Sequence, residues 1–182
     1  MAKQYFETVT PEATLVFPKL FTPESFDGVG EPKYSCILVF PKGSDLTGVK
    51  NIIKQAFDER FPKGASNARM PLCDGNEKAE VWGSVFKDAT YIRLNTKMKP
   101  AVVDSDRNFL NENEVYGGMI VRAVINAYSY DRTGNRGVNL SVSAIQVVGA
   151  GEKLGYDSSM SVNKFDKIEG GFKANDPFAD AL

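Results

Sequence analysis

The sequence contains no histidine, and its two cysteines, Cys36 and Cys73, lie far apart in the chain. Without histidine, Ser-His-Asp and Cys-His catalytic systems and histidine general bases are excluded. Two cysteines cannot complete a structural zinc site, which takes four Cys or His ligands. Neither cysteine belongs to a CxxC pair, so we expect two free thiols. The sequence favours a binding protein over an enzyme, and we expect neither a metal nor another cofactor.

Long apolar runs are also absent. No stretch approaches the ~18 to 20 apolar residues that a transmembrane helix needs. Residues 1–7 lack the apolar segment of a secretory signal. With 42% hydrophobic and 25% charged residues, the 182-residue chain has the composition of one globular domain. We therefore expect a protein that stays in the cytoplasm and makes no contact with a membrane.

The common motifs for phosphate and metal binding are absent or incomplete. There is no GxxxxGK(S/T) phosphate loop. Residues 104–108 begin like a calcium-binding loop, but Phe109 stands where the loop needs glycine and Val115 where it needs glutamate. Asp104 and Asp106 could hold Mg²⁺ in a nuclease, yet no supporting Glu or Lys framework accompanies them. A solvated turn is the better interpretation of this segment.

Charge is distributed unevenly along the chain, although the net charge is only −1. Residues 152–182 carry six acidic and four basic side chains, a net charge of −2. The preceding 151 residues carry 18 basic and 17 acidic side chains, a net charge of +1. Residues 152–182 also place isolated apolar positions among Gly, Ser and Asn. We predict a folded domain over residues 1–151 and a flexible acidic tail over residues 152–182.

Alternating apolar and polar residues predict a mainly β domain. The strongest pair of strands comes late in the domain, with residues 131–137 between them as a hairpin loop. The predicted strands are residues 13–17, 33–40, 89–96, 101–103, 119–130 and 138–148.

One amphipathic helix follows the second of these strands. Its apolar residues recur at spacings of three and four, at Val49, Ile52, Ile53, Ala56 and Phe57. Ser44 or Asp45 is expected to cap the helix, and Pro62 and Gly64 to end it. Five or six strands with one helix predict an OB-like Greek-key β-barrel. An SH3-like barrel and a plain β-sandwich remain open alternatives.

Two groups of residues interleave aromatic and basic side chains. The polar face and loop of the predicted hairpin carry Arg122, Asn126, Tyr128, Tyr130, Arg132 and Arg136. The second group is Tyr91, Arg93 and Lys97, with Trp82 and Phe86 as further stacking candidates. Aromatic rings stack on the bases of single-stranded nucleic acid, at ~1–3 kcal/mol each, while cations meet the phosphates. A solvated β face, with tyrosines that cover the barrel edges and a tryptophan in the core, is an equally good interpretation.

A resemblance to a known family lies in four segments, which are residues 13–21, 34–42, 117–130 and 137–149. They resemble tailed-phage single-stranded DNA-binding proteins, a family long catalogued as a domain of unknown function. The resemblance covers roughly residues 5–155. It implies an OB-fold that binds single-stranded DNA without sequence preference during phage DNA replication, recombination and repair, in the cytoplasm of the infected bacterium.

The position of the helix departs from that family's pattern. Here the helix follows the second predicted strand, whereas the usual OB order places it after the third. Either residues 4–9 form an additional strand, or the topology is a variant.

The end of the predicted tail combines apolar and acidic side chains, at Asp176, Phe178, Asp180 and Leu182. Such a tip can insert an apolar side chain into a partner's pocket while its carboxylates meet basic residues. The resemblance implies that the partners are phage or host replication and recombination proteins, and that the tip competes with DNA for the groove. A frayed end without a function is the alternative, and a homodimer is left open.

A structural function is the second hypothesis for the whole protein. The near-neutral charge and the β-rich pattern also fit a virion decoration or tail-assembly β-barrel. Such a protein would assemble into particles and have no affinity for DNA.

Overall fold

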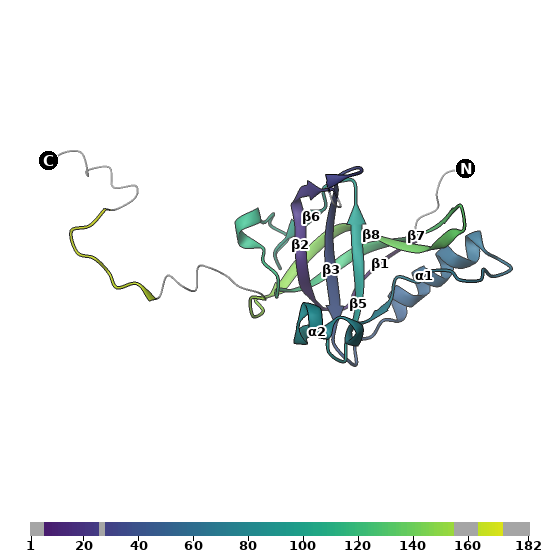
Figure 1. Ribbon diagram of the computed structural model, residues 1–182, viewed down its shortest axis with the longest axis horizontal. Coiled ribbons are helices and arrows are strands. Elements are labelled where there is room, and N and C mark those ends of the chain that lie inside the picture. Colours follow the sequence, from purple (N-terminus) through teal and green to yellow (C-terminus); the bar gives the residue numbers. More distant parts are fainter. Residues whose placement is uncertain (1–5, 26–27, 155–163, 173–182) are drawn as a thin grey trace.

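The computed structural model describes residues 6–25, 28–154 and 164–172. These residues form a mainly β domain. Figure 1 shows β2, β3 and β5 side by side, the short helix α2 at one end of them, and α1 beside the long β7–β8 hairpin. The strands are β1 (Phe6–Val9), β2 (Ala13–Glu24), β3 (Lys33–Phe40), β4 (Cys73–Asp74), β5 (Thr90–Thr96), β6 (Ala101–Val103), β7 (Ile120–Arg132) and β8 (Asn135–Gly149). The helices are α1 (Thr47–Arg60) and α2 (Ala79–Trp82), and 3₁₀ turns lie at η2 (Gly75–Glu77), η3 (Ser84–Phe86) and η4 (Glu112–Glu114).

The strands form one sheet in the order β4-β5-β3-β2-β7-β8-β6, with β1 paired to β7 beside β2. The fourth long strand, β7, thus returns to lie beside the first, β2, which is the Greek-key arrangement. Residues 97–100 connect β5 and β6, which lie near opposite ends of the sheet, and β6 pairs with β8 in parallel. This connection brings the two ends of the sheet together and curls it into the predicted OB-like barrel.

The predicted strands at residues 33–40 and 101–103 match β3 and β6 residue for residue. The predicted strand count was too low, because β1 and β4 bring the total to eight in the described part of the chain. The strand at Phe6–Val9 confirms the first of the two explanations of the helix position, an additional strand near the N-terminus. It is an additional strand on the edge of β7, so α1 follows the third strand of the chain but the second of the strands β2, β3 and β5 that begin the barrel.

The barrel interior is filled by the alternate residues of each long strand. Leu15, Leu38, Ile92, Ile125 and Ile145 are all fully buried in one cluster. The alternation predicted for the first hairpin strand is confirmed, because Val121, Ala123, Ile125 and Ala127 on one face are all buried. Burial of a Leu or Ile side chain contributes about 1.5–3 kcal/mol.

Cys36 belongs to this core. Burial raises the pKa of the Cys36 thiol to about 12, because the thiolate would lose its hydration. Both cysteines are free, as expected.

Helix α1 packs its apolar stripe against the inner face of β7 and against β1. The predicted apolar positions Val49, Ile52, Ile53 and Ala56 are buried. The cap differs from the prediction, since Leu46 occupies the N-cap position without a side-chain hydrogen bond. Asp45 instead accepts a hydrogen bond from the Thr47 backbone N–H at 3.1 Å. The Thr47 hydroxyl donates to the same carboxyl, and this bond, followed by that from the backbone N–H, lowers the pKa of the Asp45 carboxyl.

The β7–β8 hairpin is longer than predicted and closes in a two-residue turn. Thr133 and Gly134 have φ of 46° and 81°, as a type I′ turn requires at both central positions. Most of the predicted loop at residues 131–137 is therefore strand. The type I′ turn matches the twist of the strands, so the ladder continues to Arg132 and Asn135.

Residues on both sides of the predicted boundary at residue 151 form hydrogen bonds to the segment that precedes β7. The Tyr116 hydroxyl donates to the Gly151 carbonyl at 3.0 Å, and the Leu154 N–H donates to the Gly117 carbonyl at 2.9 Å.

In the described residues, none of the helices has the length and apolar character needed to span a bilayer.

Gly137 is where the connection between α1 and β4 crosses the hairpin, so we expect its replacement by alanine to destabilise the protein. The Arg69 N–H donates to the Arg136 carbonyl, and a Cβ at Gly137 would lie 2.2 Å from the Arg69 carbonyl oxygen. Gly137→Ala is expected to lower the free energy of unfolding by about 2 kcal/mol in urea titrations. Gly149→Ala, in the same strand with only ordinary contacts, should change it by less than about 0.5 kcal/mol. Equal losses in the two variants would contradict this packing.

Candidate nucleic-acid interface

A second hydrophobic cluster lies on the outside of the barrel, over β2, β3 and β5. Val16, Ile37 and Val39 point outward from these strands and are nevertheless buried. Residues 73–89 cover them, and Phe86 from this covering segment is fully buried. Strand β3 is thus buried on both faces from Cys36 to Phe40, which explains its continuous apolar sequence.

Trp82, the single tryptophan of the chain, lies half-buried on top of this cluster. Its ring centroid is 5.4 Å from that of Phe86 in a tilted pair. Phe17 and Tyr91 meet it edge to face, at 5.7 Å and 5.9 Å. Such geometry is favourable for aromatic quadrupoles, and these contacts fix the position of the indole ring.

Two cations lie over the Trp82 ring. The Arg93 guanidinium carbon and the Lys78 ammonium nitrogen are each 5.1 Å from the ring centroid. Cation–π contacts of this kind contribute about 0.5–1 kcal/mol at exposed sites. No described carboxylate forms an ion pair with Arg93 or Lys78. A partly exposed ring and two cations without carboxylate partners are therefore within a few ångströms of one another.

Phe17 contributes an exposed ring to the same place. Its side chain is 48% exposed, and its backbone φ is +48°. The pairing of β2 with β3 shifts register between Val16 and Lys19, so Phe17 occupies the irregularity. The ring therefore lies at the solvent boundary of the Trp82 cluster.

Polar residues continue this face along the strands. The register places Lys19 opposite Ser35 and Ser35 opposite Asn95, in one row across β2, β3 and β5. Beyond the end of β5, Lys97 lies 2.7 Å from Glu31, and this hydrogen bond lowers the pKa of the Glu31 carboxyl. Exposed pairs of this kind contribute little net stability, so a phosphate can replace Glu31 at small cost.

Tyr91 requires a correction. Strand β5 does turn it outward together with Arg93, as predicted from the alternation. The covering segment then buries it to 3% exposure, beneath Trp82 and Phe86. Burial, and next the neighbouring Cys73, raise the pKa of the Tyr91 hydroxyl. Its ring has no open face on which a base can stack in this structure.

The outer face of the β7–β8 hairpin holds most of the other predicted residues. Arg122 Nε donates to Gln146 Oε1 at 2.7 Å, and Asn126 Nδ2 donates to Ser143 Oγ at 2.7 Å. Gln146 Nε2 in turn donates to the Asp104 and Ser105 carbonyls. Arg122 and Asn126 are therefore part of a side-chain network that joins β7, β8 and the end of β6.

Tyr128, Tyr130 and Arg132 follow Asn126 on the same outer face of β7. Arg136 does not join them, contrary to the prediction. It lies opposite Asp131 in the ladder, so it is on the other face of the hairpin. Side chains alternate along a strand, so a turn one residue longer or shorter would move Arg136 to the opposite face of the hairpin.

Asp104 fills the role of a turn residue, as the interpretation of a solvated turn requires. Its side chain accepts hydrogen bonds from the backbone N–H groups of Asp106 and Asn108, each at 2.9 Å. These bonds, led by that from Asn108, lower the pKa of the Asp104 carboxyl. Within the three described ranges, no three Asp, Glu, Cys or His side chains gather as a metal site.

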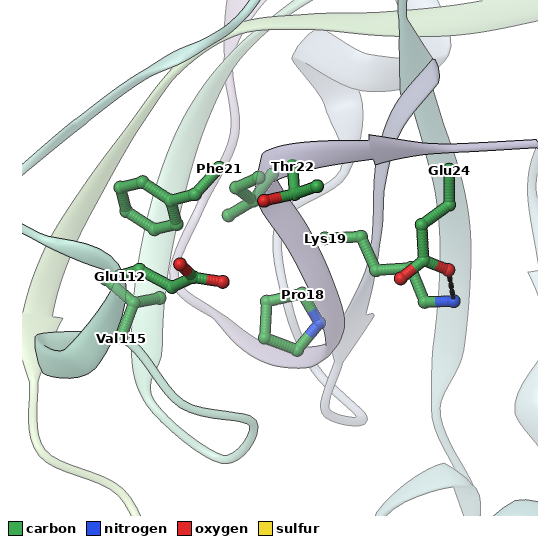
Figure 2. Close-up of a pocket in the computed structure, with 8 residues that line it drawn as sticks. Pro18, Lys19, Phe21, Thr22, Glu24, Glu112 and Val115 are labelled. Carbon is green, nitrogen blue, oxygen red and sulfur yellow. Dashed lines mark hydrogen bonds and ion pairs between the residues drawn. The ribbon is translucent and has the colours of Figure 1, made fainter. Parts of the chain in front are cut away.

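A hollow of about 190 Å³ lies beside β2, next to this face. Figure 2 shows Glu112 near the ring of Phe21, and Glu24 paired with Lys19. The Lys99 ammonium nitrogen lies over the same Phe21 ring, 5.6 Å from its centroid. Two carboxylates in the lining repel phosphate, so this hollow is a poor site for nucleic acid.

The predicted tail residues Asp176, Phe178, Asp180 and Leu182 lie outside the described residues.

The resemblance found in the sequence can be compared with known protein families. A family described as "Enterobacter phage Enc34, ssDNA-binding protein" matches residues 6–176. The chain belongs to this family. The resemblance found in the sequence is thereby confirmed, and no finding supports the hypothesis of a virion β-barrel. No curated protein matches the chain.

Solved structures of phage proteins share the fold of this family member. The single-stranded DNA-binding protein of bacteriophage Enc34 in complex with ssDNA has 22% identity and a TM-score of 0.71, over 82% of this chain and 89% of that one. Its C-terminal truncation has 22% identity and a TM-score of 0.69, over 81% and 88%. The bacteriophage T7 single-stranded DNA-binding protein gp2.5 has 16% identity and a TM-score of 0.60, over 92% and 100%.

Sequence reasoning missed two residues of the Trp82 cluster, Phe17 and Lys78. Phe17 ended a predicted strand, and no feature of the local sequence predicts its positive φ. One signal was available, because residues 36–40 are continuously apolar. Such a run indicates a strand buried on both faces, so some segment had to cover its outer side.

Phe86 is the fully buried contact that anchors residues 73–89 to the barrel. We therefore expect its truncation to expose the Trp82 ring to water. Phe86→Ala is expected to lower the free energy of unfolding by about 3–5 kcal/mol and to shift the Trp82 emission to longer wavelength. Val81→Ala is the matched control, because Val81 is 78% exposed in the same segment. It should change stability by less than about 0.5 kcal/mol. A small loss at Phe86 would show that residues 73–89 do not depend on this contact.

Proposed function

We propose that the protein binds single-stranded DNA without sequence preference on the outer face of β3 and β5. One observation carries the proposal. A partly exposed tryptophan, with two cations over its ring, lies on the strand face that OB-folds use for oligonucleotides.

The assignment of this face follows from strand order. The first three barrel strands are β2, β3 and β5, so β3 and β5 are the second and third. OB-folds bind oligonucleotides on the face of these two strands, between the loop that follows the first strand and the loop that joins the fourth and fifth. In this chain the second of those loops is the turn at Thr133 and Gly134.

The chemistry of binding requires little rearrangement. A base that stacks on Trp82 displaces Arg93 or Lys78 from the ring, and the released cation meets the adjacent phosphate. The cation exchanges one favourable contact for another, so its charge is never left without a partner. Every base has a π-face, so stacking of this kind gives affinity without sequence preference.

The hairpin extends the same binding surface. Tyr128, Tyr130 and Arg132 supply further rings and a cation on its outer face, and Lys97 supplies a cation beyond β5. Arg122 and Asn126 hold the face in shape through their bonds to β8.

Binding of this kind protects single-stranded DNA during replication, recombination and repair in the cytoplasm of an infected cell. The acidic tip of the chain is proposed to recruit replication or recombination proteins.

Binding should be visible through Trp82 itself, the single tryptophan of the chain. Oligo-dT of about 30 nucleotides is expected to quench its emission, with an affinity that falls as salt rises. Arg93→Ala should reduce the magnitude of the salt slope by about 0.7, as expected when one phosphate contact is lost. Arg60→Ala removes the same charge from α1 and should leave the slope unchanged. No quenching at low salt, or equal effects of both variants, would contradict the assignment of this face.

Arg132 and Arg136 allow a test of the hairpin, since they lie four residues apart on opposite faces. Arg132→Ala is expected to weaken oligo-dT binding and to reduce the salt slope by about 0.7. Arg136→Ala should affect neither quantity in the same anisotropy titration. A loss with Arg136→Ala alone would move the binding surface to the other side of the hairpin.

A further inference from the structure

Phe17 combines two features that each oppose folding stability. Bulky residues rarely adopt positive φ, and a residue before proline, here Pro18, is disfavoured in the helical regions. The other non-glycine residues with positive φ in the described chain are Asn67, Asp88, Arg107 and Thr133, all outside the long strands or at their turn. Phe17 is the aromatic exception among them, and it lies within β2.

The strain does not serve to bury the ring. Val16 and Leu20 on either side of the irregularity are buried, whereas Phe17 is 48% exposed. A strand that placed this ring in the core would avoid both the strained backbone and the exposed apolar surface. Strained residues that persist in this way cluster at binding and active sites.

The surroundings fix the backbone in this conformation. The Gly118 N–H donates to the Leu15 carbonyl at 2.7 Å, and the Leu15 N–H donates to the Met119 carbonyl at 2.9 Å. Gly117 lies beside Pro18, because a Cβ added to Gly117 would be 3.7 Å from Cδ of the Pro18 ring. Two hydrogen bonds at Leu15 and a packing contact at Pro18 therefore flank Phe17, whose ring meets Trp82.

The geometry at Trp82 leaves room for a ligand. The two rings meet edge to face at an interplanar angle of 83°, so their planes differ and they can meet two different bases. Phe17 remains 48% exposed in this pair. Arg93 and Lys78 lie over the neighbouring indole, so the charge next to the exposed phenyl ring is positive. An exposed aromatic ring beside cations that lack carboxylate partners matches the chemistry of a nucleotide.

We propose that Phe17 is a base-stacking residue, held in a strained conformation so that it presents a second stacking ring beside Trp82. This inference rests on the proposed binding of single-stranded DNA. Adjacent bases stack on the two rings, while Arg93 and Lys78 meet the phosphates. The alternative is that Phe17 only shields the edge of Trp82 from water.

Leucine and tyrosine at position 17 distinguish the two roles. Phe17→Leu keeps an apolar side chain over Trp82 but removes the aromatic face, and Phe17→Tyr keeps the face. For a stacking residue, Phe17→Leu should weaken oligo-dT binding by about tenfold, and Phe17→Tyr should bind like the wild type. Phe109→Leu is the control, because Phe109 is 79% exposed outside this face.

A second variant guards against a folding defect. Asparagine adopts positive φ more readily than phenylalanine, so Phe17→Asn removes the ring and keeps the backbone conformation. It should melt cooperatively and show the same loss of affinity. Wild-type affinity in the Phe17→Leu variant would overturn the inference while the proposed function stands. Absence of binding by the wild-type protein would instead refute the proposed function itself.

Discussion

The covering of the outer face of β3 is the interaction on which the candidate site depends. Strand β3 is apolar on both faces, so a barrel alone would leave Ile37 and Val39 in water. Residues 73–89 bury them, with the fully buried Phe86 as the main contact. The same segment ends its short helix at Trp82 and so places an indole ring on the outside of the barrel. A requirement of folding thereby positions the residue proposed to bind DNA.

Charge has a secondary part in this account. The body of the chain is nearly neutral, and Lys19 and Lys97 on the candidate face already pair with Glu24 and Glu31. Arg93 and Lys78 have aromatic partners instead of carboxylates. Affinity in such a protein depends on stacking as much as on phosphate contacts, so a weakly charged chain can bind single-stranded DNA.

Sequence reasoning predicted the parts of the fold that follow from local periodicity. The boundaries of β3 and β6, the buried stripe of α1 and the core face of β7 all come from alternation or helical spacing. It could not predict what lies over an outward face, so Tyr91 was expected to be open. It also misjudged Arg136, since the facing of residues near a turn depends on the exact loop length. The strain at Phe17 arises from long-range bonds and leaves no local pattern.

Photocrosslinking with oligo-dT that carries 5-iododeoxyuridine tests the central claim most directly. The iodinated base couples to an aromatic side chain on which it stacks, and mass spectrometry of the digested complex locates the linked residue. The account predicts crosslinks at Trp82 and Phe17. Crosslinks confined to Tyr128 and Tyr130 would place the DNA on the hairpin and contradict the assignment to the outer face of β3 and β5.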